Sequence, residues 1–116
     1  MEISPMTARA KEKFDEVVKY LEEHNKYQKI DDTLIEIFAR AYDTYLEYQG
    51  IVATEGAVIE SDKGNKYINP SNMIMQQSFN TMKSLIRELG IGGLARIKLD
   101  MKEPQETSEI AEILRG

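Results

Sequence analysis

The sequence contains no cysteine, and its only histidine is His24. Without cysteine the chain can form neither a disulfide nor a thiolate metal site, although this leaves its redox compartment open. A single histidine excludes most zinc sites and the Ser/His or Cys/His nucleophile systems, which need a positioned imidazole. These absences make an enzyme the weaker class, and we expect no cofactor.

Long apolar runs are also missing. No stretch of the sequence is apolar over the roughly 18 residues that suggest a membrane-spanning helix. The N-terminal residues lack the apolar core of a signal peptide. We therefore expect a protein of the cytoplasm, with no membrane among its partners.

The charge is negative overall but unevenly distributed. The 116 residues carry a net charge of −5, with 41% apolar and 30% charged residues, as is usual for one folded domain. Residues 31–50 sum to −4 and residues 103–116 to −3, whereas residues 70–102 sum to +3. We therefore predict a single domain over residues 1–102, followed by an acidic tail or docking helix over residues 103–116.

Two helices are predicted in the first half of the chain. The pair Ser4-Pro5 is typical of a helix start, and Asn25 can adopt the left-handed conformation that ends a helix. The second helix is predicted over residues 31–49, with Gly50 as its end. Its apolar stripe is broader than one buried face requires, which suggests contact with more than one neighbour, including another subunit.

A β-hairpin and a third helix are predicted next. β-forming residues in 51–69 flank the turn signal Asp62-Lys63-Gly64-Asn65. Asn69-Pro70 then starts a helix with regular apolar spacing, and Gly90 ends it. Shorter helices are expected over residues 94–99 and from Thr107 or Ser108 onward. The predicted fold is mainly α: a helical hairpin of two long helices joined by a small β-hairpin, with an N-terminal helix and short C-terminal helices.

Residues 30–99 contain four features in a fixed order. A long helix with Tyr42 and Tyr45 closes on Gly50-Ile51-Val52, and a polar hairpin with a Gly64-Asn65 turn follows. Asn69-Pro70 then opens a helix that ends in the sequence RELGI, and a short basic helix, LARIKL, comes last. In this order and spacing, the segment resembles phage terminase small subunits of the short type. The turn reads Gly-Asn where the family has Asn-Gly, and Gly92-Gly93 replaces a Thr-Pro type cap.

The resemblance implies a role in viral genome packaging. Such small subunits assemble into rings, recognise double-stranded viral DNA, and regulate a large subunit that supplies the ATPase and nuclease. They do no bond chemistry themselves. By the same analogy, the acidic tail is expected to contact the large subunit.

Two basic clusters are the candidate DNA contacts, and neither is preferred. Because a ring repeats each weak contact, even an acidic chain can bind DNA if its few cations converge on one surface. No helix-turn-helix with base-reading residues is recognisable. The candidate DNA-binding residues are Arg96, Lys98 and Lys102 in one cluster and Arg9, Lys11 and Lys13 in the other.

The apolar stripes are the candidate surfaces for contact between subunits. The tyrosines among them could stack on bases, but helical spacing in an apolar stripe favours core or subunit packing. The candidate oligomerisation residues are Leu34, Phe38, Tyr42, Tyr45, Phe79, Met82 and Ile86.

Other functions stay open at this point. The net negative charge and the acidic tail also fit a helical protein–protein adaptor that binds no DNA. The acidic pairs Asp31-Asp32 and Glu22-Glu23 are better explained by helix capping and solvation than by a metal. The glycines of residues 90–93 lack the Gly-Lys-Ser/Thr ending of a phosphate-binding loop and follow a helix.

Overall fold

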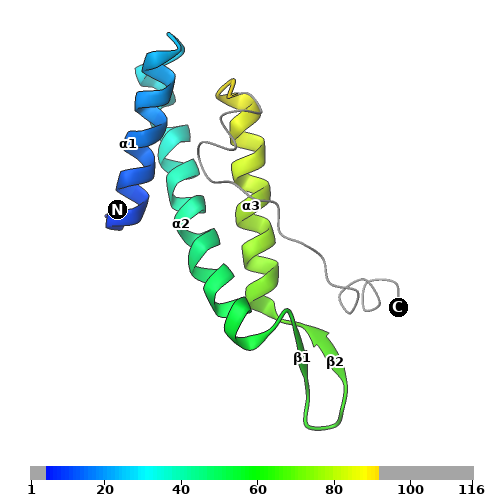
Figure 1. Cartoon of the computed structure of the whole chain (residues 1–116). Helices are drawn as coiled ribbons and strands as arrows, with labels where there is room; N and C mark the ends of the chain where they lie inside the picture. Colours follow the sequence, from blue (N-terminus) through cyan, green and yellow to red (C-terminus); the bar gives the residue numbers. More distant parts are fainter. Residues whose placement is uncertain (1–4, 92–116) are drawn as a thin grey trace.

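The computed structural model describes residues 5–91, which form three long helices and one β-hairpin (Figure 1). The predicted mainly α fold, with two long helices joined by a small hairpin and preceded by an N-terminal helix, is confirmed. The predicted short C-terminal helices lie outside the described residues. In order, the elements are α1 Ala8–Glu23, a single 3-10 turn η1 Lys29–Asp31, α2 Asp32–Glu55, β1 Val58–Glu60, β2 Lys66–Ile68 and α3 Pro70–Glu88.

Helix α1 begins three residues later than Pro5. Thr7 is its N-cap, and the Thr7 hydroxyl oxygen accepts a hydrogen bond from the Ala10 amide at 3.1 Å. The predicted start at Ser4-Pro5 is therefore wrong, because a second capping residue lies nearer to the first buried position, Ala10. The predicted end is confirmed: Asn25 has a φ of +56°, and the Lys26 amide donates to the Leu21 carbonyl at 2.8 Å.

Helix α2 runs straight through Gly50 and ends five residues beyond it. Its last residue is Glu55, and Gly56, at a φ of +93°, follows as the C-cap. The prediction that Gly50 ends this helix is wrong. A glycine inside a helix costs only about 1 kcal/mol relative to alanine, and the partial burial of Ile51 and Val52 on the following turn offsets that cost. Both side chains had been predicted to belong to the β-rich segment.

The β-hairpin extends from the end of the helix pair (Figure 1). Its antiparallel register pairs Val58 with Ile68, Ile59 with Tyr67, and Glu60 with Lys66. The predicted turn is confirmed: the Gly64 amide donates to the Ser61 carbonyl at 2.9 Å, and Gly64 has a φ of +84°. Glycine tolerates this left-handed conformation, which lets the chain reverse in a short loop.

Asn69 joins the hairpin to both long helices. This side chain is only 2% exposed, and its amide nitrogen donates to the Glu55 side chain at 3.1 Å and to the Gly56 carbonyl at 2.9 Å. Its amide oxygen accepts from the Ser71 backbone amide at 3.0 Å and so caps α3. With Pro70 at the first helical position, the predicted start of α3 is confirmed. One buried polar side chain thus fixes the end of α2 and the start of α3.

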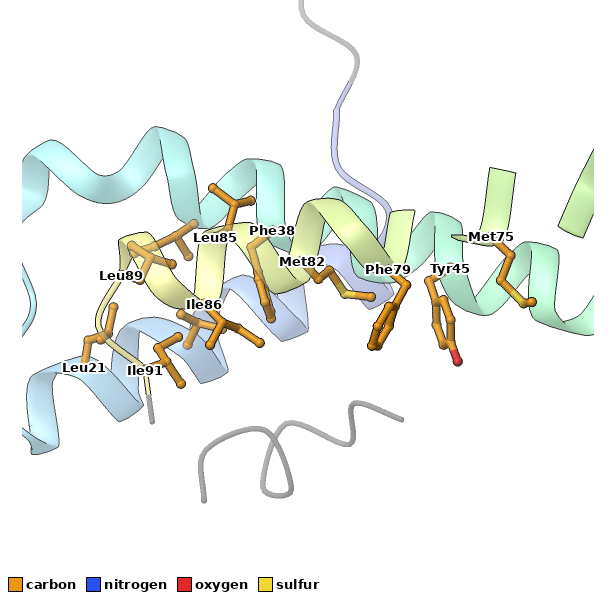
Figure 2. Packing of buried hydrophobic residues seen from close by; sticks show 12 residues of the cluster. Leu21, Phe38, Tyr45, Met75, Phe79, Met82, Leu85, Ile86, Leu89 and Ile91 are labelled. Carbon is orange, nitrogen blue, oxygen red and sulfur yellow. The ribbon is translucent and has the colours of Figure 1, made fainter. Parts of the chain in front are cut away.

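The core lies mainly between α2 and α3, which run antiparallel because the hairpin returns the chain (Figure 1). Phe38 is completely buried, and the Tyr45 and Phe79 rings lie 6.1 Å apart between centroids (Figure 2). Helix α1 packs on α2, and its Val17 and Leu21 belong to the same cluster.

The predicted end of α3 is confirmed: its last helical residue is Glu88, and Gly90 follows the C-cap Leu89. Gly90 has a φ of +71°, and the Ile91 amide donates to the Ile86 carbonyl at 2.9 Å. The Lys26 ammonium also donates to the Gly90 carbonyl at 2.8 Å, so a cation lies at the negative end of the α3 dipole. The loop after α1 is thereby tied to the end of α3.

Replacing Gly50 and Gly90 by alanine should change the stability of the fold in opposite directions. Gly50 lies in a helix and an added Cβ meets nothing within 4 Å. We expect Gly50→Ala to stabilise the fold by roughly 0.5–1 kcal/mol, because alanine loses less entropy in a helix. An added Cβ at Gly90 also meets nothing within 4 Å, but its φ is +71°. Gly90→Ala should therefore destabilise by about 1–2 kcal/mol. Urea unfolding of both variants measures the two changes.

The two glycines serve as each other's control, since both accept a methyl group without a clash. A loss of stability in Gly50→Ala would mean that α2 does not continue as a helix through residue 50.

Candidate nucleic-acid interface

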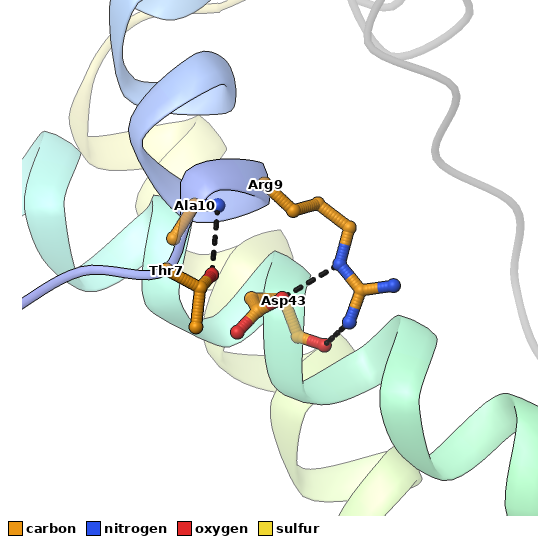
Figure 3. A network of polar contacts seen from close by, with 4 residues as sticks. All are labelled: Thr7, Arg9, Ala10 and Asp43. Atoms are coloured by element: carbon orange, nitrogen blue, oxygen red, sulfur yellow. Dashed lines mark hydrogen bonds and ion pairs between the residues drawn. The ribbon is translucent and has the colours of Figure 1, made fainter.

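The N-terminal cluster of predicted DNA contacts lies where α1 packs on α2. The Arg9 guanidinium donates to the Asp43 carboxylate at 2.6 Å and to the Asp43 carbonyl at 3.1 Å (Figure 3). This ion pair is partly exposed, so we expect it to contribute about 1 kcal/mol or less to stability. It fixes where the first turn of α1 sits along α2.

Lys13 is buried in the contact between the same two helices. It is 5% exposed, its ammonium lies 3.0 Å from a Glu16 carboxylate oxygen, and it lies 4.3 Å from the centroid of the Tyr42 ring. A cation over an aromatic face is attracted by the ring quadrupole, and the paired carboxylate offsets the cost of burying the charge. Lys13 therefore holds α1 on α2, and little of it is accessible to DNA.

A polar pocket of about 200 Å³ opens beside these two cations. It is lined by Arg9, Glu12, Lys13, Glu16 and Tyr42. Two carboxylates accompany the two cations, so the charge of the lining is balanced. A phosphate entering this pocket would be repelled by Glu12 and Glu16 as well as attracted by the cations.

Lys11 is exposed but does not share a face with Arg9 and Lys13, the other two residues of this predicted cluster. Residues two apart in a helix lie about 200° apart around the axis, so Lys11 faces away from Arg9 and Lys13. The structure brings Arg9 and Lys13 together and leaves Lys11 alone. DNA contact by these three residues stays a prediction, and the structure places Lys11 best for it.

The second predicted cluster, Arg96, Lys98 and Lys102, lies outside the described residues. The same holds for the acidic tail of residues 103–116.

Most of the predicted oligomerisation residues form the core of a single chain. Phe38, Tyr45, Phe79, Met82 and Ile86 are all buried between the helices, and only Leu34 and Tyr42 stay partly exposed. The five buried side chains have no surface left for contact with another copy in this fold. A helical stripe identifies buried positions, but it does not say whether a helix of the same chain or of another chain covers them.

Four exposed apolar side chains were not singled out from the sequence. Ile30, in η1, is 83% exposed, and Ile37, Tyr67 and Met73 are also exposed. Ile37 lies at the edge of the apolar stripe of α2, three residues after Leu34. Helical spacing places it beside the stripe but does not show whether another segment covers it.

Two tyrosines have pKa values above their usual range. The Tyr27 hydroxyl donates to the Asp32 carboxylate at 2.6 Å, and this hydrogen bond is the main cause of its raised pKa. Burial raises the pKa of Tyr45. Both rings therefore remain neutral near pH 7, and neither makes a catalytic base.

Residues 5–91 contain neither a cluster of metal-binding side chains nor a membrane-spanning helix. No three His, Asp or Glu side chains in that range gather closely enough to hold a metal ion. None of its helices combines the length and the apolar character that crossing a membrane requires.

A comparison with protein families bears out the resemblance noted above. The family model described as phage terminase, small subunit, matches residues 10–106, which include α2, α3, the β-hairpin and all of α1 except its first two residues. Neither the curated proteins nor the solved structures gave a match to this chain. Because the family model spans most of the sequence, the chain belongs to the phage terminase small subunit family and has a role in phage genome packaging.

Proposed function

We propose that this protein assembles into a ring, recognises double-stranded viral DNA, and regulates the ATPase and nuclease of a large terminase subunit. It does so in the host cytoplasm and without catalysing a reaction itself. The observation that carries this proposal is the family match over residues 10–106. Its partners would be viral DNA, the large subunit and further copies of itself.

Assembly is supported by apolar surface that the single chain leaves uncovered. Ile30, in η1, and Ile37, in the second turn of α2, are seven residues apart in sequence, and both are exposed. Leu34, between them in sequence, is partly buried. Covering such side chains is favourable by roughly 25 cal/mol per Å² of apolar area, so contact between copies would stabilise both. The candidates for the subunit contact are therefore Ile30, Leu34, Ile37 and Tyr42, in place of the buried core residues.

Repetition in a ring would also compensate for weak DNA contacts. An acidic chain gains little from one phosphate contact, but several linked subunits bind the same duplex at a high effective concentration. The family role and the negative net charge are therefore compatible.

The adaptor hypothesis is favoured by one observation. Residues 31–50, most of α2, carry five acidic residues and one basic residue. Such a surface suits a basic protein partner better than DNA. An adaptor would bind no DNA at any salt concentration, which separates the two functions.

Aspartate at both exposed isoleucines should weaken assembly. We expect light scattering to show a multi-subunit particle for the wild-type protein. Ile30→Asp/Ile37→Asp should shift it to smaller species, because a carboxylate is costly to bury in an apolar contact.

Gln49→Asp adds a carboxylate at another exposed position of α2 and is the matched control. A monomeric wild-type protein at high concentration would contradict ring assembly. An unaltered particle in the double variant would show that the contact lies elsewhere.

DNA binding should weaken steeply as salt is raised. Each neutralised phosphate of a duplex contributes about −0.9 to the slope of log K against log salt concentration. We expect a clear negative slope for the full chain on a duplex carrying the packaging start site. Fluorescence anisotropy over a salt series measures it, and absence of binding at low salt would favour the adaptor.

Deleting residues 103–116 should separate assembly from regulation. We expect the shortened protein to form the same particle and to lose its stimulation of the large-subunit ATPase. Light scattering and an ATPase assay on the same preparation measure the two properties. Unchanged stimulation would contradict the assigned role of the tail.

A further inference from the structure

A long stretch of the chain carries positive charge and no acid. Residues 63–87 contain Lys63, Lys66, Lys83 and Arg87 and not a single aspartate or glutamate. The chain as a whole has 20 acidic residues among 116, so a gap of this length stands out in the sequence. It coincides with β2 and almost all of α3.

One face of α3 is buried and the opposite face is exposed. The buried face contributes Met75, Phe79 and Met82 to the core. The exposed positions recur every three or four residues, which places them along one side of the helix. From residue 77 to residue 87 this side spans about 15 Å. Its exposed residues are Gln77, Asn80, Thr81, Lys83, Ser84 and Arg87.

Most of these side chains can donate hydrogen bonds to an anion. Lys83 and Arg87 are one helical turn apart, and Gln77, Asn80 and Ser84 add neutral donors. Glu88 is also exposed and lies one turn after Ser84, so this side carries one carboxylate, at its C-terminal end. From residue 77 to residue 87, the exposed side of α3 is polar, positively charged and free of carboxylates.

Three cations of the other two long helices have carboxylate partners. Arg9 pairs with Asp43, Lys13 with Glu16, and Arg40 with Glu36. Within residues 5–91, no ion pair forms to Lys83 or Arg87. Their charge is therefore not neutralised inside the described fold and remains available to an outside anion.

The lysines of the hairpin do not extend this surface. Lys66 lies directly opposite Glu60 in the strand register, and Lys63 follows Asp62 in the turn. Cross-strand neighbours of opposite charge interact with each other, so the tip of the hairpin is close to neutral. Within residues 5–91, the positive surface of α3 therefore does not extend onto the hairpin.

We propose that the exposed face of α3, with Lys83 and Arg87 as its cations, binds the phosphate backbone of double-stranded DNA. The inference rests on the proposed function, in which DNA is a partner, and it assigns the contact to residues outside both basic clusters predicted from the sequence. These contacts position the protein on the duplex and read no bases.

A protein partner would fit this face less well. The centre of a protein–protein contact is enriched in aromatic and other apolar side chains. Here the exposed apolar residue is Met73, at the N-terminal end of α3, and the rest of the face is polar. Unpaired cations with neutral donors between them suit a row of phosphates.

The test compares two double variants of the full chain that remove the same charge. Lys83→Gln/Arg87→Gln removes the cations of α3, and Lys63→Gln/Lys66→Gln removes those of the hairpin. All four side chains are exposed, so both variants should fold. Circular dichroism and light scattering check that fold and particle size match the wild type.

We expect the α3 variant to lower the slope of log K against log salt by about 1–2 per bound subunit, in line with two lost phosphate contacts. Its affinity for duplex DNA at low salt should fall at least tenfold. The hairpin variant should keep the wild-type slope and affinity.

Each of the other outcomes contradicts a specific part of the proposal. If the wild type binds DNA and the α3 variant binds with the same slope, the assignment to α3 is wrong and the proposed function stands. If the wild type itself does not bind, DNA recognition and this inference both fail. If the α3 variant keeps DNA binding but loses stimulation of the large subunit, the face contacts protein instead.

Discussion

The packing of α2 against α3 is the constraint on which the rest of the structure depends. Phe38 is fully buried in this contact, and the Tyr45 and Phe79 rings meet 6.1 Å apart further along it. The two helices can pack antiparallel because a short β-hairpin reverses the chain and buried Asn69 binds both of its ends. Helix α1 packs on this helix pair, mainly against α2.

This packing decides which side chains remain for other molecules. The broadest apolar stripes are buried inside one chain, so the proposed assembly would rely on peripheral residues such as Ile30 and Ile37. A modest patch suits a ring, because each subunit makes two contacts and closure adds their effects. The fold and the proposed assembly thus draw on different sets of apolar residues.

The same packing also separates paired cations from cations that lie apart from carboxylates. Joining α1 to α2 pairs Arg9 with Asp43 and holds buried Lys13 beside Glu16 and Tyr42. Helix α3 has no acidic residue before Glu88, so its two cations lie on a face with no carboxylate until the last residue of the helix. A chain with a net charge of −5 can in this way present one positive face, which net charge alone does not reveal.

The sequence by itself determined the helices, the hairpin turn and three of the helix ends, because caps and turns depend on residues close together in the chain. Asn25, Asn69-Pro70 and Gly90 act through local backbone geometry, and so each was predicted correctly. Tertiary structure alone decided that α2 continues through Gly50 and that Lys13 is buried. It also decided that Phe38 and Tyr45 pack inside one chain. Each of these outcomes depends on burial against a distant segment, and a periodic pattern shows that a face is covered without showing which segment covers it.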